Sequence, residues 1–292
     1  MRRLGCKIVA QNALEEIKKE TQLFVSKGNK APSLAVILVG EDPASCTYVR
    51  KKAEAAEELG FRHLQLTLDE NSTEEEVLSL IDRLNRDDDV DGILVQLPLP
   101  SHISERKVID SISAAKDVDG FSPVNQGRLL IGESSFVPCT PKGIMEVLRY
   151  YRIPTSGRKA VVIGRSNIVG KPMAVLLMQK GVDATVTVCN TKTEDLRSVT
   201  LDADIIVVAT GRPGTIDESY VKDGAAVIDV GVNRIPDPSR KNGFRLVGDA
   251  DYKSFSERDV SITPVPGGIG LMTVSMLMAN TLEAAKMRRG MA

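Results

Sequence analysis

Short apolar runs alternate with longer amphipathic segments through the first half of the chain. The apolar runs predict β-strands, whose successive side chains point to opposite faces of a sheet, and the amphipathic segments predict helices. The predicted strands cover residues 33–40, 64–68 and 92–97. The predicted helices cover residues 8–27, 44–59, 72–85 and 105–113. Strands that alternate with helices indicate an α/β fold with a parallel sheet covered on both faces.

Two of the helix starts carry polar signatures. Ser72 and Glu75 have the spacing of a capping box, in which each side chain accepts a hydrogen bond from the other residue's backbone N–H. Thr140 and Pro141 combine a capping residue with a proline in the first turn. Between these two starts, residues 116–137 lose their periodicity and carry several Gly, Pro and Asp residues, which predicts a crossing between domains.

A second series of strands and helices follows this crossing. The predicted strands cover residues 160–163, 185–189, 205–209 and 226–231. The predicted helices cover residues 173–180, a short segment near Asp195 and the final stretch 272–286. This order is typical of a Rossmann-like domain.

The loop between Gly164 and Gly170 has the clearest local pattern of the second series. A β-branched run precedes it, and Pro172 lies in the first turn of the helix that follows. A strand, a glycine-bounded loop and a helix start direct free backbone N–H groups at one point, where a phosphate can bind. Five residues separate the two glycines, a spacing unlike that of common dinucleotide-binding folds, so an ordinary strand–helix turn explains the pattern equally well.

Length and composition limit the classes of protein. A chain of 292 residues with 42% hydrophobic and 26% charged residues predicts about two domains, each with its own core. The net charge of -1 argues against electrostatic binding to nucleic acid or to an anionic membrane. We therefore expect no nucleic acid partner and no membrane partner.

Cysteine and histidine usage narrows the chemistry. The four cysteines lie far apart and the chain has two histidines, which argues against a disulfide framework, a metal site and Ser–His–Asp catalysis. No apolar run has the length of a signal peptide core or a membrane span. These features predict a cytoplasmic protein in a reducing compartment.

Tyr48 and Lys52 are the first candidate pair for catalysis. They are four residues apart in a predicted helix and so share one face. A phenol beside an amine can position that amine for proton transfer. Charged neighbours such as Arg50 and Lys51 also fit a solvated helix face, and the spacing alone favours this second interpretation.

Two further candidates follow a predicted strand and lie in the crossing. Gln96 stands where the prolines Pro98 and Pro100 end a strand, so its amide either holds a reacting group or caps the loop backbone. The segment 116–121 contains Asp117 and Asp119, and a carboxylate there either accepts a pair of N–H groups from a ligand ring or forms a turn before Gly120. The residues alone do not separate these alternatives.

The segment 263–270 and the end of the strand 185–189 suggest where ligands bind. The first is rich in proline and glycine and precedes the last helix, which favours a binding loop over a plain connector.

Enzymes that use NAD commonly place an acid after the second Rossmann strand to bind the ribose hydroxyl. Here Thr191 and Lys192 stand at that point and Arg165 lies in the first loop, which favours the 2′-phosphate of NADP.

Five of these segments, in this order, resemble the bifunctional methylenetetrahydrofolate dehydrogenase/methenyltetrahydrofolate cyclohydrolase family. The resemblance extends over essentially the whole chain and its motifs cover residues 48–52, 95–100, 116–120, 164–172 and 263–270. It implies a homodimer that oxidises 5,10-methylenetetrahydrofolate with NADP and hydrolyses the methenyl product to 10-formyltetrahydrofolate, within one-carbon metabolism. A dehydrogenase without cyclohydrolase activity and a non-catalytic dinucleotide-binding regulator remain as alternatives.

The resemblance also implies a domain arrangement and roles for single residues. A folate-binding catalytic domain of residues 1–138 plus 272–292 and an NADP-binding domain of residues 139–271 are expected to form a cleft. Catalysis is assigned to Lys52, Tyr48, Gln96 and Asp119. Folate contacts are assigned to Tyr48, Gln96, Leu97, Pro98, Asp119, Pro264, Gly267 and Gly268. Cofactor contacts are assigned to Gly164, Arg165, Ser166, Ile168, Thr191, Lys192 and Val232, and no metal is expected.

The sequence departs from the family pattern at three places. Asn190 and Thr191 replace the His-Ser pair of many relatives, Leu271 replaces a proline after the glycine turn, and Glu54 replaces a basic residue. None of these changes removes a residue to which the resemblance assigns catalysis.

Overall fold

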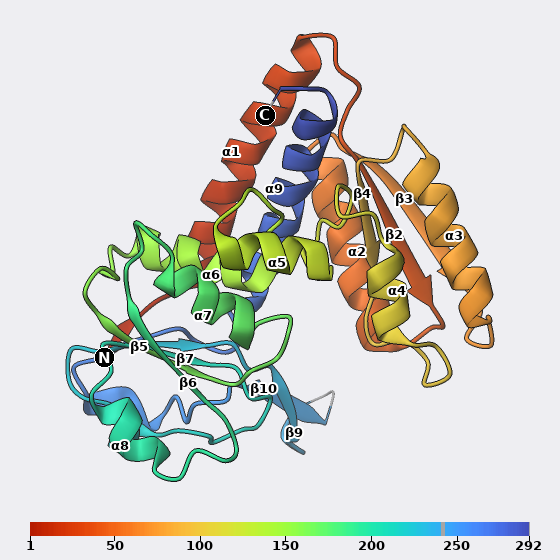
Figure 1. Cartoon of the computed structure of the whole chain (residues 1–292). Helices are drawn as coiled ribbons and strands as arrows, with labels where there is room; N and C mark the ends of the chain where they lie inside the picture. Colours follow the sequence, from red (N-terminus) through yellow and green to blue (C-terminus); the bar gives the residue numbers. More distant parts are fainter. Residues whose placement is uncertain (241–242, 292) are drawn as a thin grey trace. The chain divides into compact units, whose positions relative to one another are not determined.

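The computed structural model describes residues 1–240 and 243–291, which form two compact α/β units (Figure 1). The first unit comprises residues 11–139 and those from 274 onward, and the second comprises residues 1–10 and 140–273. The first ten residues group with the second unit because Arg2 and Arg3 pair with Ser261 and Ile262 as parallel strands. No described helix is long and apolar enough to cross a membrane.

The sheet of the first unit has three parallel strands, with β2 (Ser33–Val39) between β3 (Arg62–Leu68) and β4 (Gly92–Val95). Every residue of β2 and β4 is buried, as their continuous apolar sequence predicts, whereas the edge strand β3 alternates between exposed and half-buried residues. The helices that lie wholly in this unit are α2 (Pro43–Glu58), α3 (Glu74–Arg86), α4 (Glu105–Ser111) and α5 (Pro123–Ile131).

The capping box of α3 lies one residue later than predicted. Thr73, and not Ser72, accepts a hydrogen bond from the backbone N–H of Glu76, while the Glu76 carboxylate accepts one from Thr73 N. The sequence contains both pairs, Ser72 with Glu75 and Thr73 with Glu76, and both satisfy the pattern. Ser72 N instead donates to the Asp69 carbonyl in the preceding turn, which leaves Thr73 at the helix start.

The predicted unstructured crossing contains a helix. α5 is capped by the hydroxyl of Ser122, starts with Pro123 and ends at Gly132 in the left-handed conformation. The helix was not predicted because it contains Gly127 and its apolar pattern is short. The segment belongs to the first unit up to Cys139.

A buried lysine stabilises the end of α3. Lys116 is 1% exposed, and its ammonium donates to the carbonyl oxygens of Leu84 at 2.8 Å and Asp87 at 2.6 Å. These carbonyls belong to the last turn of α3 and its cap, and each also accepts a longer bond from a backbone N–H, Leu84 O from Asp87 N at 3.3 Å and Asp87 O from Val90 N at 3.2 Å. The first residue of the 116–121 segment therefore has a structural role.

We expect Lys116→Met to lower the free energy of unfolding by roughly 1–3 kcal/mol, because two carbonyl oxygens each lose a short hydrogen bond from a charged donor. Urea denaturation of the purified chain measures this change. Lys107→Met is the matched control, since that exposed lysine pairs with Glu74, and surface pairs contribute about 0–1 kcal/mol. Equal losses in the two variants would contradict the capping role.

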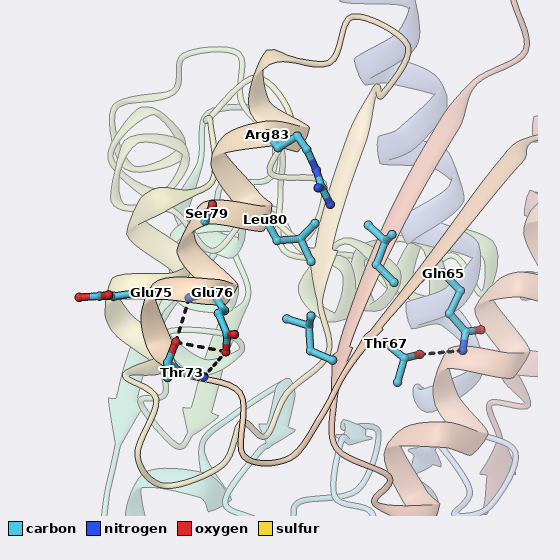
Figure 2. A pocket seen from close by; sticks show the side chains of 10 residues that line it. Gln65, Thr67, Thr73, Glu75, Glu76, Ser79, Leu80 and Arg83 are labelled. Carbon is cyan, nitrogen blue, oxygen red and sulfur yellow. Dashed lines mark hydrogen bonds between the residues drawn. The ribbon is translucent and has the colours of Figure 1, made fainter.

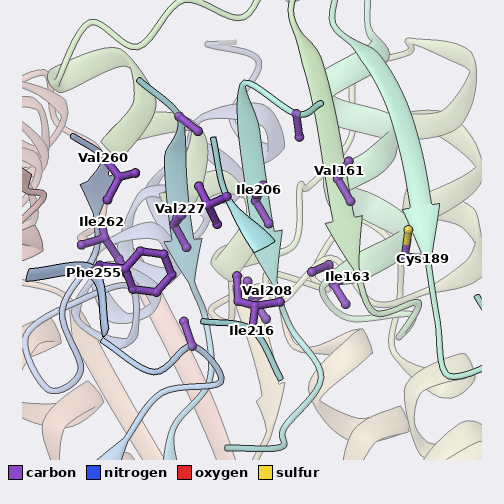
Figure 3. Close-up of a cluster of buried hydrophobic side chains, with 14 residues drawn as sticks. Val161, Ile163, Cys189, Ile206, Val208, Ile216, Val227, Phe255, Val260 and Ile262 are labelled. Carbon is purple, nitrogen blue, oxygen red and sulfur yellow. The ribbon is translucent and has the colours of Figure 1, made fainter. Parts of the chain in front are cut away.

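The second unit contains a six-stranded parallel sheet of order β1-β11-β8-β7-β5-β6. Its strands are β1 (Arg2–Arg3), β5 (Lys159–Ile163), β6 (Thr185–Cys189), β7 (Ile205–Val208), β8 (Ala226–Asp229) and β11 (Ser261–Ile262). A buried apolar cluster fills one face of this sheet; Figure 3 shows Val161, Ile206, Val227 and Ile262 of neighbouring strands with Phe255. The strands predicted from residue 160 onward are confirmed to within two residues at each end.

Helices and one hairpin complete the second unit. The helices of this unit are α7 (Gly170–Met178), α8 (Leu196–Leu201) and the short η1 (Glu218–Tyr220) and η2 (Ser254–Glu257). α1 (Cys6–Ser26), α6 (Cys139–Tyr150) and α9 (Gly270–Arg288) each have residues in both units. The antiparallel strands β9 (Asn233–Pro236) and β10 (Phe244–Val247) were not predicted, because their short sequences mix polar, charged and apolar residues.

Candidate functional site

Lys52 lies on α2 of the first unit and is 9% exposed, although Arg50 and Lys51 beside it are exposed. Its ammonium donates to the Gln96 side-chain oxygen at 2.9 Å. Burial lowers the pKa of Lys52, and the nearby charges of Asp119 and Cys139 oppose this change. The solvated-face interpretation is therefore wrong for Lys52, while Tyr48, one turn earlier on the helix, remains 44% exposed.

Gln96 immediately follows β4, at the carboxyl end of the sheet. Its backbone N–H donates to Ile37 O and continues the strand pairing. The side-chain amide donates to Leu97 O at 2.6 Å while its oxygen accepts from Lys52. The amide therefore caps the loop backbone, as one of the two alternatives predicts, and the same bond fixes the orientation of the oxygen that Lys52 contacts.

The loop after α4 separates the roles of its two aspartates. Asp117 accepts from Phe121 N at 3.2 Å and from Ser122 N at 2.8 Å, and therefore forms the turn. Asp119 is half-buried, with the Cys139 sulfur 3.7 Å from its carboxylate. Burial raises the pKa of Asp119 to about 6, although the positive charge of Lys52 opposes the rise. The turn interpretation applies to Asp117 and leaves the Asp119 carboxylate available to a ligand.

Gly120 fixes the path of this loop. Its φ is +71°, and a Cβ would lie 2.5 Å from Phe136 O, so a larger residue would displace the backbone.

The first unit thus contains a buried amine (Lys52), an amide (Gln96) and a carboxyl group (Asp119). Among the described residues, no cluster of three or more His, Cys, Asp or Glu side chains could hold a metal ion.

A pocket of about 370 Å³ lies in the second unit at the carboxyl ends of β5, β6 and β7. Strand β5 lies between the other two, so the pocket occupies the topological switch point where open α/β sheets bind ligands. It is lined by Ile163, Gly164, Arg165, Ser166, Asn190, Thr191, Leu196, Ala209, Thr210, Arg212 and Thr215.

Close packing requires both glycines of the loop that follows β5. At Gly164, where φ is +119°, a Cβ would overlap the carbonyl oxygen of Ala209, and at Gly170 it would overlap the carbonyl oxygen of Gly164. The Ser166 hydroxyl accepts from Val169 N at 3.2 Å and Gly170 N at 3.3 Å, and thereby closes the loop onto α7. The glycines thus hold the loop against β7 and the start of α7.

The proline- and glycine-rich segment 263–270 joins β11 to α9. The buried Thr263 hydroxyl accepts from Asp229 N at 2.8 Å, and Gly267 O accepts from Cys6 N at 3.1 Å. Pro264 and Gly268 are buried and Gly267 is half-buried, with a φ of +96°. Side-chain and backbone bonds on both sides therefore hold the loop in place.

Comparison with known proteins identifies the family. The tetrahydrofolate dehydrogenase/cyclohydrolase catalytic domain matches residues 4–119, and the NAD(P)-binding domain of the same enzymes matches residues 138–289. The chain belongs to the tetrahydrofolate dehydrogenase/cyclohydrolase family. Its relatives include the bifunctional protein FolD of Bacteroides thetaiotaomicron, 52% identical over 96% of each chain.

Solved structures of tetrahydrofolate dehydrogenase/cyclohydrolases have the same fold. The bifunctional enzyme FolD of Campylobacter jejuni is 48% identical and superimposes with a TM-score of 0.92 over 99% of both chains. The dehydrogenase-cyclohydrolase of Trypanosoma brucei, solved with NADP cofactor and an inhibitor, is 41% identical with a TM-score of 0.91, covering 97% of this chain and 96% of that one.

For this tetrahydrofolate dehydrogenase/cyclohydrolase, the structure brings together some of the predicted residues. Lys52 bonds to Gln96 and is coupled electrostatically to Asp119, and four predicted cofactor residues (Gly164, Arg165, Ser166 and Thr191) line one pocket. Ile168, Lys192 and Val232 are exposed in the second unit and are not among the residues that line this pocket.

One wall of the pocket was not predicted from the sequence. Residues 209–215, which follow β7, supply Ala209, Thr210, Arg212 and Thr215. They follow a predicted strand, so the signal that could have found them is that β7 neighbours β5 in the sheet. At the departures from the family pattern, Glu54 is exposed with its carboxylate 3.8 Å from Arg50, and Leu271 is 39% exposed.

Proposed function

We propose that this chain oxidises 5,10-methylenetetrahydrofolate to 5,10-methenyltetrahydrofolate with NADP and then hydrolyses the product to 10-formyltetrahydrofolate. The observation that carries the proposal is the buried Lys52 ammonium bonded to Gln96 in the same unit as Asp119. A dehydrogenase without the hydrolytic step has no evident need for a buried amine with a lowered pKa. The dinucleotide pocket of the second unit supports the oxidation step.

The oxidation step requires orientation more than acid–base catalysis. The tetrahydrofolate nitrogen lone pair expels a hydride from the one-carbon bridge to the nicotinamide, which leaves the methenyl cation. We assign Asp119 to the pterin, Tyr48 to a stacking position, and Leu97, Pro98, Pro264, Gly267 and Gly268 to the folate. The chain thereby contributes position, which lowers the entropic cost of the transfer.

The hydrolysis step requires a base. Water attacks the methenyl carbon and loses one proton to the base. The hydroxyl proton of this adduct is then transferred to the departing nitrogen as one carbon–nitrogen bond breaks, which leaves the formyl group on the other nitrogen. Burial lowers the pKa of Lys52 and increases its neutral fraction, and the cationic substrate would act in the same direction. We propose Lys52 as the base and Gln96 as the residue that orients it.

The charges that line the dinucleotide pocket favour NADP over NAD. Among the described lining residues, Arg165 and Arg212 are cations and none is a carboxylate. NAD-selective sites commonly place an acid on the ribose 2′-hydroxyl, whereas Arg suits the 2′-phosphate. Thr191 lies at the end of β6 in the same pocket, and we assign the phosphates to the loop of Gly164, Arg165 and Ser166.

Paired assays on one preparation test the function. NADPH formation from methylenetetrahydrofolate, compared with NADH formation, measures the oxidation step and coenzyme preference. Decay of methenyltetrahydrofolate absorbance without coenzyme measures hydrolysis. We expect both activities; oxidation without hydrolysis would favour the monofunctional alternative, and the absence of both would favour a non-catalytic dinucleotide-binding regulator.

The pKa values predict distinct pH profiles for the two steps. Asp119 loses its negative charge as pH falls through about 6, so we expect KM for methylenetetrahydrofolate to rise below that pH. The kcat of hydrolysis should also decrease as pH decreases, because protonation removes the neutral form of Lys52. Steady-state kinetics of both activities measure the profiles. Retention of the KM inflection in Asp119→Asn would contradict the assignment to Asp119.

We also propose that the protein is a homodimer paired through the edge strand β3 and helix α3. Strand β3 pairs on one side with β2, and a pocket of about 780 Å³ lies between it and α3, lined by residues such as Gln65, Thr67, Glu75 and Arg83 (Figure 2). The first turn of α3 is acidic and its last turn is basic. Two copies related by a two-fold axis would place acidic turns against basic turns.

Charge exchange on α3 tests this dimer. We expect Arg83→Glu to weaken self-association at least ~10-fold, and Glu75→Lys combined with Arg83→Glu to restore much of it, because the reversed pairs again have opposite sign. Sedimentation equilibrium measures the association constant. Arg106 on α4 forms an exposed i,i+4 pair with Asp110 at 3.5 Å, so Arg106→Glu is the control outside α3, and we expect it to leave the association constant unchanged. A monomeric unsubstituted chain would refute the dimer.

A further inference from the structure

Two buried carboxylates lie near residues that line the dinucleotide pocket, although they do not line it themselves. Asp249 is 0% exposed and Asp229 is 2% exposed, on the segment after β10 and at the end of β8. Isolated buried carboxylates are costly, so their hydrogen-bond partners indicate what they organise.

Asp249 holds the pocket wall that follows β7. One carboxylate oxygen accepts from Thr210 N at 2.6 Å, Gly211 N at 2.9 Å and the Thr210 hydroxyl at 3.1 Å. The other accepts from the Asn233 side-chain amide at 2.8 Å. The carboxylate therefore joins the β7 loop to the start of β9.

Asp249 also fixes the rest of this loop. Thr215 N donates to Asp249 O at 2.7 Å, and the hydroxyls of Thr210 and Thr215 are 2.8 Å apart. Arg212 N donates to the Thr210 hydroxyl at 3.3 Å, and Arg212 O accepts from the Thr215 hydroxyl at 2.8 Å. The backbone that presents Arg212 to the pocket is thus fixed through Asp249.

Asp229 in turn fixes Asp249. Its carboxylate accepts from Gly231 N and Asp249 N, both at 2.9 Å, and from Ala250 N at 3.0 Å. A Cβ on Gly231 would overlap the Asp249 carboxylate, and a Cβ on Gly248 would overlap that of Asp229, so packing around the pair is close. Burial raises the pKa of Asp229 to about 6 in spite of these donors.

We propose that Asp249, held by Asp229, is a positioning residue that preorganises the Thr210–Thr215 loop for NADP. The inference rests on the proposed NADP-dependent function. A loop already ordered in the free protein loses less conformational entropy when the coenzyme binds. The carboxylate acts through the loop and contacts no reacting atom, so its loss raises the KM for NADP much more than it lowers kcat.

Asp249→Asn tests the proposal, because it keeps the shape and replaces one acceptor oxygen by a donor that faces N–H groups. We expect the KM and calorimetric Kd for NADP to rise about 10- to 100-fold, with kcat at saturating NADP within about 3-fold of the unsubstituted chain. Hydrolysis of methenyltetrahydrofolate without coenzyme should be unchanged, since the proposed base Lys52 and its partner Gln96 lie in the first unit. Asp251→Asn, an exposed carboxylate two residues away, is the matched control.

Asn233→Ala is a milder second variant that is informative even if Asp249→Asn does not fold. The Asn233 side chain donates to Asp249 and to Gly248 O and does not line the pocket, so we expect a rise of about 3- to 10-fold in KM for NADP. Unchanged NADP affinity in both folded variants, or equal losses of kcat and coenzyme-independent hydrolysis, would overturn the inference. Failure of the unsubstituted chain to bind NADP would instead refute the proposed function.

Discussion

Replacing Lys52 with Met is expected to lower the kcat of methenyltetrahydrofolate hydrolysis by about 10²- to 10⁴-fold, the usual contribution of a positioned acid or base. Met preserves much of the volume and apolar stem of a side chain that is 9% exposed, so the fold should survive. NADP reduction should persist at a measurable rate, because hydride transfer needs no protein base. Absorbance assays of the two steps on the same preparation measure the separation.

Lys51→Met is the matched control for this experiment. Lys51 is the preceding residue of α2 and is exposed, so its replacement removes the same charge from the same helix without touching Gln96. We expect both activities to stay within about 2-fold of the unsubstituted chain, as for a surface substitution. A Lys52→Met enzyme that hydrolysed methenyltetrahydrofolate at the normal rate would end the assignment of the base.

Gly170→Ala is expected to have the second largest effect, on NADP binding. Its Cβ would overlap the Gly164 carbonyl oxygen, so the loop that lines the pocket must move. Strain of this kind costs about 1–3 kcal/mol, which corresponds to roughly 5- to 150-fold in the Kd for NADP when it is expressed in binding. Isothermal titration calorimetry measures the affinity, and urea denaturation detects any part of the cost that appears in stability.

Gly270→Ala provides the comparison for Gly170→Ala. Both glycines are the first residue of a helix, and neither has a positive φ, but a Cβ on Gly270 meets no atom within 4 Å. We expect its NADP affinity and free energy of unfolding to change by less than about 0.5 kcal/mol. Equal effects at the two positions would show that helix-start glycine itself matters, and that the contact between Gly170 and Gly164 does not.

The sequence predicts elements best where the apolar pattern is continuous. Strands β2 and β5 and the helix α2 lie within one residue of their predicted ends, because buried strands and amphipathic helices have distinct periodicities. The capping box of α3 was placed one residue early, since two overlapping residue pairs satisfy the same rule. Helix α5 was missed because a proline start and an internal glycine resemble a loop.

The site shows a different limit of sequence-based reasoning. Spacing alone favoured a solvated face for Lys52, because burial depends on what packs against a helix and not on the helix itself. The resemblance of several motifs in order corrected that interpretation. Asp117 and Asp119 can be assigned different roles only from the structure, in which Asp117 accepts hydrogen bonds from Phe121 and Ser122.

The missed pocket wall and its carboxylate anchor depend on strand order. Thr210 and Arg212 reach the same pocket as Arg165 because β7 lies next to β5. Asp249 is 39 residues from Thr210 in sequence and meets it through a hydrogen bond that no local pattern signals. Such contacts follow from tertiary pairing, which the sequence of one chain specifies only indirectly.

A crystal structure with a bound folate analogue tests the assigned site. We expect the pterin to contact the Asp119 carboxylate and the one-carbon end to lie within hydrogen-bond reach of the Lys52 ammonium, at about 2.6–3.2 Å or through one water. An analogue bound with full occupancy at a position remote from Lys52, Gln96 and Asp119 would contradict the account.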